Sequence, residues 1–162
     1  MAGKVYTKPM ETKDSYEWIL NQLPYADPFL FVDELHEVGP NGVRGSYTFK
    51  DDNVFYQGHF KDGPVTPGVL LTECCAQIGL VCLGISLLKQ ETKTGEFTMG
   101  MSHMQMDFLK PVFPGERVMV VSEKDYFRFG KLQCKVKMYN EQKELVCKGL
   151  LSGMLKMGKD HG

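Results

Sequence analysis

An almost unbroken run of apolar and small residues in the middle of the chain predicts a long buried helix. Over residues 66–88 the helix would be hydrophobic nearly all round, so it must be wrapped by the rest of the domain. Thr66 suits the N-cap, and Pro67 suits the first helical position, where no amide hydrogen is needed. At about 1.5 Å per residue the helix would be roughly 33 Å long. Because Pro67, Glu73 and Gln77 interrupt the run, a membrane span is not expected.

The chain on both sides of this run has β-strand character. Before it, residues 29–38 are rich in aromatic and branched side chains, and residues 43–49 alternate between apolar and polar positions. Between these two segments, Gly39-Pro-Asn-Gly42 is a strong turn signal and predicts a hairpin. After the run, proline, glycine and asparagine separate four more expected strands: residues 96–108, 117–127, 131–139 and 145–155.

Two strands, one buried helix and four strands predict an α+β domain in which an antiparallel sheet of about six strands curls around the helix. The length of 162 residues suits a single domain that spans residues 1–162. Residues 1–12 are expected to form a loose leader. Residues 14–23 are expected to form a short helix that ends before a proline, with Asp14 or Ser15 as its cap.

Composition and charge argue against several classes of function. The formal net charge of −1 argues against general binding to nucleic acids or to a membrane surface. The charge is uneven, because from Lys110 onward eleven Lys and Arg face six Asp and Glu. This basic part of the chain can receive an acidic partner, although a solvated sheet face explains it as well. The four histidines are scattered without ligand spacing, so no metal site is expected.

The five cysteines are expected to be free thiols. They show no CxxC spacing, and no signal peptide precedes them. Three of them, Cys74, Cys75 and Cys82, lie in the apolar run, where a free cysteine behaves as a small hydrophobic residue. We therefore expect reduced thiols in the core of a cytoplasmic protein.

His59 and Glu73 have the setting that most favours acid–base chemistry. His59 lies between Gly58 and Phe60 in a loop, and a histidine side chain moves protons readily near neutral pH. Glu73 is the only carboxylate in the apolar run, where an ionised carboxylate is costly to bury without a partner. It is therefore either a structural group with a buried partner or a carboxyl group that holds a proton and acts as a general acid. For His59 as well, a structural role is the simpler alternative.

The backbone amide of Gly68 supplies a third candidate group. Because Pro67 has no amide hydrogen, the Gly68 amide is among the first unsatisfied donors of the helix and lies at the positive end of its dipole. Glycine also leaves room for an incoming oxygen atom. A base, an acid and an oxyanion donor within fifteen residues fit enolate-type chemistry next to a carbonyl group.

This central stretch resembles the 3-hydroxyacyl-[acyl-carrier-protein] dehydratases of the FabZ/FabA type. The residues GHF…PVTPGVLLTECCAQ are similar to the family signature GHFPxxPVMPGVLxxEAMAQ, with fourteen residues from His59 to Glu73 as in the family. Two other segments are also similar, LPYADPFLFVDEL to LPHRxPFLLVDRV and FLKPVFPGE to FRRPVVPGD. The resemblance covers roughly residues 23–155.

The resemblance implies a hotdog fold, no cofactor, and a homodimer that often assembles as a trimer of dimers. Each active site would take the histidine from one subunit and the acid from the other. His59 would remove the α-proton of a 3-hydroxyacyl thioester on acyl carrier protein, and Glu73 of the partner subunit would protonate the departing hydroxyl. The Gly68 amide would polarise the thioester carbonyl. The product would be a trans-2-enoyl thioester for fatty-acid or related polyene and lipid biosynthesis.

Further site residues are assigned on the same resemblance. Substrate contacts beside Gly68 are expected from Phe60, Val69 and Gln77. The methionine-rich strand after the helix can fill the core or line an acyl tunnel, for which the candidates are Met99, Met101 and Phe108. Tyr25 stands where the family has the histidine of LPH, and GHFKDG replaces the usual GHFPG. These departures bear on chain length and pathway more than on reaction type.

Three other functions stay open on the sequence. A hotdog acyl thioesterase also carries a carboxylate on its central helix but has no need of the histidine. An enoyl-CoA hydratase of this fold usually has an Asp-x4-His pattern, which is absent around His59. An inactive acyl-binding subunit of a hetero-oligomeric dehydratase would have no reason to keep both His59 and Glu73. If an acidic carrier protein binds, contacts are expected from Lys110, Arg117, Arg128 and Lys131.

Overall fold

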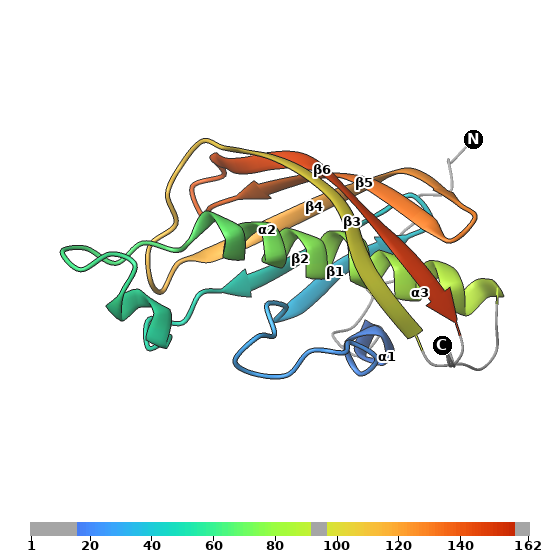
Figure 1. Ribbon diagram of the computed structural model, residues 1–162, viewed down its shortest axis with the longest axis horizontal. Coiled ribbons are helices and arrows are strands. Elements are labelled where there is room, and N and C mark those ends of the chain that lie inside the picture. The colour runs from blue at the N-terminus through green and yellow to red at the C-terminus, as the bar shows by residue number, and fades with distance from the viewer. Residues whose placement is uncertain (1–15, 92–96, 158–162) are drawn as a thin grey trace, which may run out of the picture.

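The computed structural model describes residues 16–91 and 97–157, and a single long helix lies at its centre (Figure 1). The helix has three consecutive parts, α2 (Gly68–Ala76), a π-helical turn η3 (Gln77–Val81) and α3 (Cys82–Glu91). Its stretch Gly68–Lys89 is long and apolar enough to cross a membrane, but 78% of the window that meets this criterion is buried inside the domain. It is therefore the buried core helix that the apolar run predicts.

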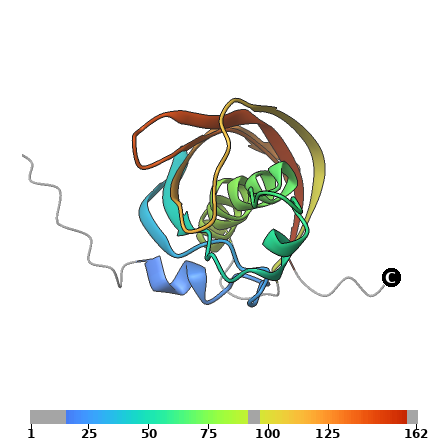
Figure 2. The same cartoon turned by 90° about the vertical axis from the view of Figure 1, so that its left-hand side faces the viewer.

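One antiparallel sheet wraps around this helix. Its strands are β1 (Glu34–Gly39), β2 (Gly42–Thr48), β3 (Phe97–Phe108), β4 (Arg117–Arg128), β5 (Lys131–Tyr139) and β6 (Leu145–Met157). They lie in the order β1-β2-β4-β5-β6-β3, and every neighbouring pair is antiparallel. Figure 2 shows the sheet curved around the helix. The predicted α+β architecture is confirmed.

The helix and the inner face of the sheet share one hydrophobic core. Side chains alternate along β4, so that the buried Val118 and Val120 face the helix while their neighbours face outward. The helix approaches the sheet closely at Gly79, where an added Cβ would lie 2.9 Å from a methyl carbon of Val136 and 3.0 Å from Cβ of Ser122. This contact fixes the helix against β4 and β5.

The first strand starts later than the sequence predicts. Of the segment 29–38, only the part from Glu34 onward pairs as a strand, because the preceding residues bond to the helix. The Phe31 N–H donates to Oε1 of Gln77 (2.7 Å), and the Phe29 carbonyl accepts from Nε2 of the same side chain (3.0 Å). Phe31 is buried, whereas Phe29 is 46% exposed, so the backbone bonds to Gln77 and not strand pairing hold this segment beside the helix.

The central helix begins one residue later than predicted. Pro67 is the N-cap, with an extended backbone, and Gly68 is the first helical residue. Thr66 has another task, since its hydroxyl shares a 2.6 Å hydrogen bond with the hydroxyl of Tyr56 and its N–H donates to the Val112 carbonyl (2.8 Å). These bonds fix the segment that enters the helix.

The N-terminal helix α1 (Glu17–Leu20) is shorter than the predicted segment 14–23. It is anchored by Ile19, which is fully buried. The expected leader and the two expected cap residues lie outside the described residues. The predicted hairpin is confirmed, because Gly39 pairs with Gly42 around a two-residue loop between β1 and β2.

All five cysteines are free and buried, as predicted. Burial raises the pKa of the Cys82 thiol, and it raises that of Cys134 to about 11. Both thiols therefore stay protonated at neutral pH and act as packing groups.

Candidate active site

His59 lies in a loop that backbone hydrogen bonds hold on both sides. The 3₁₀ helix η2 (Val54–Gln57) ends at Gly58; the His59 N–H donates to the Phe55 carbonyl (3.0 Å), and the Val65 N–H donates to the His59 carbonyl (2.9 Å). Nδ1 of His59 lies 2.8 Å from the Val65 carbonyl oxygen. Since a carbonyl oxygen only accepts, this bond places the ring proton on Nδ1 and leaves Nε2 as the nitrogen that can take a proton. The half-buried ring is thus prepared to act as a base.

Phe60 and the residues after it form a tight turn beside the His59 ring. The two rings are stacked, with centroids 4.0 Å apart, and the peptide between the two residues is cis. The Phe60 N–H donates to the Gly63 carbonyl (2.9 Å), and the Gly63 N–H donates back to Phe60 (3.2 Å). The GHFKDG segment therefore forms a surface turn that is closed by its own backbone hydrogen bonds. The Phe60 side chain is 59% exposed in the single chain.

Gly68 lies at the start of the helix, under an aromatic ring from the end of β3. As the first helical residue it has no intrahelical acceptor for its N–H, and the positive end of the helix dipole lies there. The ring of Phe108 covers it, because an added Cβ at Gly68 would be 3.2 Å from a ring carbon. The next residue, Val69, is exposed. Gly68 and Phe108 are thus in contact at the N-terminal end of α2.

Glu73 lies half-buried on α2, and Gln77 holds its carboxylate. Nε2 of Gln77 donates to Oε1 of Glu73 (3.1 Å) from one helical turn away. Gln77 itself is fully buried, and its bonds to the backbones of Phe29 and Phe31 fix the orientation of its carboxamide. Within one chain Gln77 therefore orients Glu73. The predicted contact between Gln77 and the substrate stays a prediction.

The π-helical turn η3 begins at Gln77 itself. The Cys82 N–H donates to the Gln77 carbonyl five residues back, and the hydroxyl of Ser122 on β4 donates to the Gly79 carbonyl (2.8 Å). π-helical turns are rare and occur often at functional sites. The sequence carries no pattern for this turn, and the role of Gln77 in orienting Glu73 was also missed. The spacing of four residues between the two side chains is the signal that could have shown it.

The candidate tunnel residues lie on the edge strand of the sheet. Met99, Met101 and Phe108 on β3 pair with inward-facing positions of β6, so they point toward the side of the sheet that carries the helix. Met99 packs on the core, whereas Met101 and Phe108 are 41% and 51% exposed. In the described part of the chain β3 has a neighbouring strand on one side only. An apolar strip is therefore open to solvent along this edge.

Tyr25, which stands in the position of the family's LPH histidine, lies close enough to Glu73 to sense its charge. Burial and then the negative charge of Glu73 raise the pKa of Tyr25 to about 12. Its ring lies 6.4 Å from that of Phe29, centroid to centroid. Tyr25 is therefore a neutral hydroxyl group at physiological pH. Unlike a histidine, it cannot place a positive charge near Glu73.

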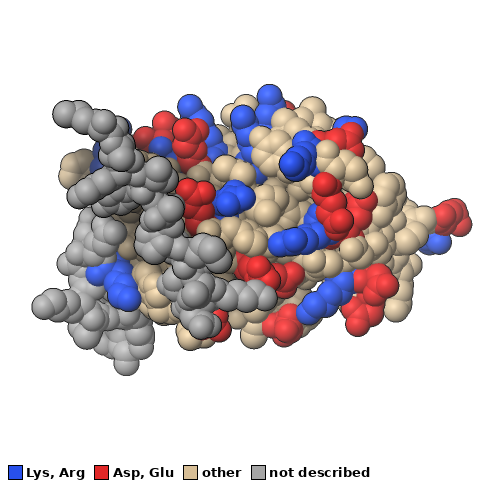
Figure 3. All heavy atoms as spheres, turned by 180° about the vertical axis from the view of Figure 1, so that it is seen from behind, with Lys and Arg blue, Asp and Glu red and all other residues tan. Residues whose placement is uncertain are grey.

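The four basic residues expected to meet a carrier protein do not form one surface. Arg117 begins β4 and Arg128 ends it, so roughly 36 Å separate them at about 3.3 Å per residue. Lys131 pairs with Arg128, whereas Lys110 and Arg117 both bond to the turn at residues 141–144. On the face shown in Figure 3, basic and acidic side chains are interspersed. The four basic residues therefore form two separate pairs and not one patch.

One protein family matches most of the chain. A FabA-like domain matches residues 23–149, which is most of the sequence. The chain belongs to the FabA-like family. The matched region contains His59, Gly68 and Glu73, and it agrees with the extent of the resemblance seen in the sequence.

Relatives in sequence are dehydratases. The 3-hydroxyacyl-[acyl-carrier-protein] dehydratase FabZ of Acinetobacter baylyi is 34% identical over 115 residues, which cover 71% of this chain and 74% of that protein. The enzyme of the same name from Acetivibrio thermocellus is 37% identical over 120 residues, which cover 73% of this chain and 79% of that protein. This chain is therefore similar to FabZ over most of both sequences.

Solved structures support the fold. The dehydratase heterocomplex ApeI:P from Xenorhabdus doucetiae matches with a TM-score of 0.71 and 14% identity, and the match covers 85% of this chain and 90% of that one. A hypothetical thioesterase with coenzyme A from Streptococcus pneumoniae has a TM-score of 0.57 at 12% identity, with 78% and 88% of the two chains covered. At these identities the likeness shows the fold alone. The predicted hotdog fold is confirmed.

The described residues of one chain do not join His59 to Glu73. The His59 side chain bonds to Val65 and that of Glu73 bonds to Gln77, and no hydrogen bond links the two. Val65 precedes Gly68 by three residues, so at most about 10 Å of chain separates the carbonyl that holds His59 from the candidate oxyanion donor. Glu73 lies about 7.5 Å further along the helix axis than Gly68.

Proposed function

We propose that the protein dehydrates 3-hydroxyacyl thioesters carried on acyl carrier protein to trans-2-enoyl thioesters. The observation that carries this proposal is the bond from Nδ1 of His59 to the Val65 carbonyl, which leaves Nε2 as a base next to the start of the helix. Membership of the FabA-like family and the similarity to FabZ support the same reaction. Fatty-acid biosynthesis is the pathway class that this reaction serves in the family.

The proposed reaction breaks one C–H bond and one C–O bond and forms one C=C bond. Nε2 of His59 takes the proton from the carbon next to the thioester carbonyl, and the Gly68 N–H donates to the carbonyl oxygen as it gains negative charge. The carboxyl group of Glu73 gives its proton to the 3-hydroxyl group, which leaves as water. Return of the proton from His59 to Glu73 restores the starting state. The residues involved supply every proton, so no step calls for a cofactor.

We propose that the carboxyl group comes from a second subunit. In one chain the apolar strip of β3 is exposed, as are Phe60 and Val69 near the mouth of the helix. The open edge of β3 is a natural template for pairing with another strand. A dimer formed along this edge would cover the strip and set the His59 loop of one subunit toward Glu73 of the partner subunit. A trimer of such dimers is a further expectation from the family.

The proposed carrier protein would approach where Lys110 lies. Lys110 follows Phe108 by two residues, and Phe108 covers Gly68, so this lysine is at the mouth of the site. Its ammonium group forms an exposed ion pair with Glu144. An acidic carrier surface would compete for that ammonium group, and added salt should raise KM for carrier-bound substrate more than for short thioester analogues.

The test is an assay of 3-hydroxyacyl-carrier dehydration with purified protein. His59→Ala and Glu73→Gln should each lower kcat by about 10²- to 10⁴-fold, because each removes a group that transfers a proton. Asp62→Asn, an exposed change in the turn after His59, is the matched control and should keep full activity. Full activity in either site variant would refute the assignment. Release of free thiol would identify a thioesterase, and a purified homo-oligomer without turnover would indicate an inactive subunit.

A further inference from the structure

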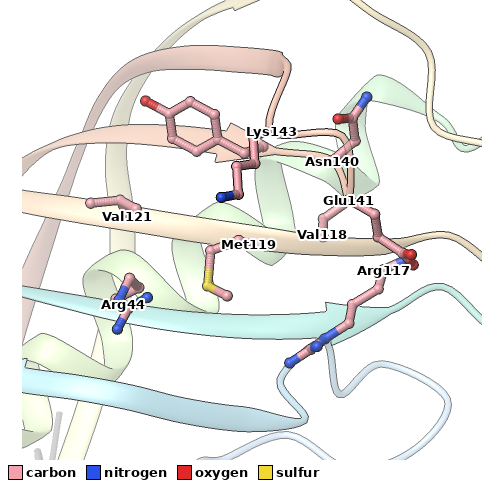
Figure 4. A pocket seen from close by; sticks show the side chains of 9 residues that line it. Arg44, Arg117, Val118, Met119, Val121, Asn140, Glu141 and Lys143 are labelled. Atoms are coloured by element: carbon pink, nitrogen blue, oxygen red, sulfur yellow. The ribbon is translucent and has the colours of Figure 1, made fainter.

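A pocket of about 660 Å³ lies on the outer face of the sheet, across the sheet from the central helix (Figure 4). Its walls come from β2, β4, the end of β5 and the turn that follows β5. None of His59, Gly68 and Glu73 lines it. The pocket is therefore distinct from the candidate active site.

The floor of this pocket is apolar, although it lies on the solvent side of the sheet. Met119 and Val121 alternate with the buried valines of β4 and so face outward, and Val121 is 38% exposed. Tyr139 pairs with Met119 across the β4–β5 ladder and adds an aromatic wall. The next outward pair along the same ladder is Val121 opposite Lys137, and the pair after it is charged on both strands, Glu123 opposite Lys135. An antiparallel sheet normally shows polar side chains to water, so this confined apolar floor calls for a partner.

Three cationic side chains line the same pocket from three different elements. Arg44 comes from β2, Arg117 from the start of β4, and Lys143 from the turn after β5. Figure 4 shows Lys143 reaching toward Met119 from one side, with Arg44 and Arg117 on the other. The single carboxylate of the lining, that of Glu141, accepts the Arg117 backbone N–H (3.3 Å). The lining therefore holds three cations and one carboxylate, and Nε of Arg44 also pairs with Glu37 (3.7 Å), which lies outside the lining.

The fold holds the Arg117 guanidinium directly and fixes the backbone of Lys143. Nη2 of Arg117 donates to the hydroxyl of the buried Ser46 (3.1 Å), and the remaining guanidinium donors are directed by this bond. Lys143 has a left-handed backbone (φ 62°) in a turn that is closed by the bond from its own N–H to the Asn140 carbonyl (3.0 Å). The turn therefore fixes the backbone of Lys143, while its exposed side chain keeps its own rotamer freedom.

We propose that this pocket binds a small amphipathic anion. A carboxylate or phosphate group would contact Arg44, Arg117 and Lys143, and an attached apolar group would cover Met119 and Val121. The volume lies within the usual range for small-ligand sites, and an apolar lining with a few convergent charges is their usual composition. The charge of the rim selects an anion, and the floor selects one with an apolar part. This site stands independently of the proposed dehydration.

Methyl-labelled methionine provides a reporter inside the pocket. In the full chain with ¹³C-methyl methionine, the Met119 signal is assigned by its loss in Met119→Leu. Titration with octanoate and with octyl phosphate should shift the Met119 signal to saturation, and the arm that binds more tightly distinguishes a carboxylate from a phosphate ligand. Octan-1-ol and octyltrimethylammonium, which lack the anion, should leave it unchanged. The signals of Met99 and Met101 report separately on ligand that enters the candidate acyl tunnel.

Charge variants complete the test. Lys143→Gln should raise the Kd measured at Met119 about three- to fivefold, as expected for the loss of one exposed charge pair. Lys135→Gln, on the same outer face but away from the pocket, should leave it unchanged. The proposal fails if Met119 does not respond at millimolar anion, if octan-1-ol shifts it equally, or if only Met99 and Met101 respond. A change of oligomeric mass in Met119→Lys would show that the face joins copies of this chain, which also overturns the proposal.

Discussion

At the scale of single residues, two side-chain contacts prepare the candidate chemistry. The Val65 carbonyl fixes the tautomer of His59, so that the nitrogen able to accept a proton is Nε2. The Gln77 carboxamide holds one oxygen of Glu73 and leaves the other for substrate. Neither contact involves a charged partner, so the base and the acid are oriented without being neutralised.

Replacing Gln77 by methionine tests its role in orienting Glu73. Gln77→Met keeps the volume but leaves the Phe31 N–H without its acceptor and Glu73 without its donor. We expect the free energy of unfolding, measured in urea, to fall by about 1–3 kcal/mol, because a buried donor is left unsatisfied. We also expect kcat to fall more than KM rises. Gln142→Met, at an exposed turn position, should change neither quantity; equal stability of the two variants would contradict the role.

Protonation of His36 is expected to lower the free energy of unfolding in acid. Its Nε2 lies 2.8 Å from the hydroxyl of Ser46, and burial lowers its pKa below the ordinary 6.5, with Glu34 opposing and Arg44 and Arg117 adding to the shift. As pH falls through 6.5 the unfolded chain binds the proton more readily than the folded one, so the free energy of unfolding decreases.

His36→Gln removes this titration. Urea unfolding at pH 7.5 and pH 5.5 should show a smaller loss of stability in the variant than in the wild type. The same loss in both proteins would mean that another group is responsible.

At the scale of the elements, the edge strand β3 would form the interface of the proposed dimer. Met101→Lys places a charge in its apolar strip and should convert the dimer into monomers, seen by light scattering after size-exclusion chromatography. Met154→Lys is a matched control, because Met154 is 40% exposed, as against 41% for Met101, but lies on the outer face of β6. Dimers of unchanged stability in Met101→Lys would show that the interface lies elsewhere.

The contact between the π-helical turn and the sheet gives a second test at this scale. An added methyl group in Gly79→Ala would overlap Val136 and Ser122, so the free energy of unfolding should fall by about 1–3 kcal/mol. Gly100→Ala on β3, where nothing lies within 4 Å of an added Cβ, is the control and should be nearly neutral. Equal effects in the two variants would contradict the close packing at Gly79.

The sequence patterns predicted the elements well where burial and periodicity agree. The apolar run and the alternating strands identify the central helix and the sheet, because both patterns follow directly from which faces are buried. The residues before Glu34 do not pair as a strand, since the backbones of Phe29 and Phe31 bond to the Gln77 side chain, a long-range contact that no local pattern reveals. The π-helical turn accepts a hydrogen bond from Ser122, which is likewise distant in sequence.

At the scale of the whole molecule, the motif predicted the candidate site residues but not their contacts. The spacing between His59 and Glu73 is visible in the sequence, whereas the Val65 and Gln77 partners depend on the folded loop and helix. The basic residues were grouped by composition, and the strand geometry separates them into two pairs. A single chain presents the base and the acid without joining them, which leads to the central claim that two subunits share each active site.

A purified heterodimer of His59→Ala and Glu73→Gln chains, selected with two affinity tags, tests this claim most directly. If each site takes His59 from one subunit and Glu73 from the partner subunit, one of its two sites contains both intact residues and the other contains neither. This heterodimer should show about half the wild-type dehydration rate per dimer, while each parent homodimer should be nearly inactive. A heterodimer as inactive as its parents would show that His59 and Glu73 work within one chain and that the subunits do not share their active sites.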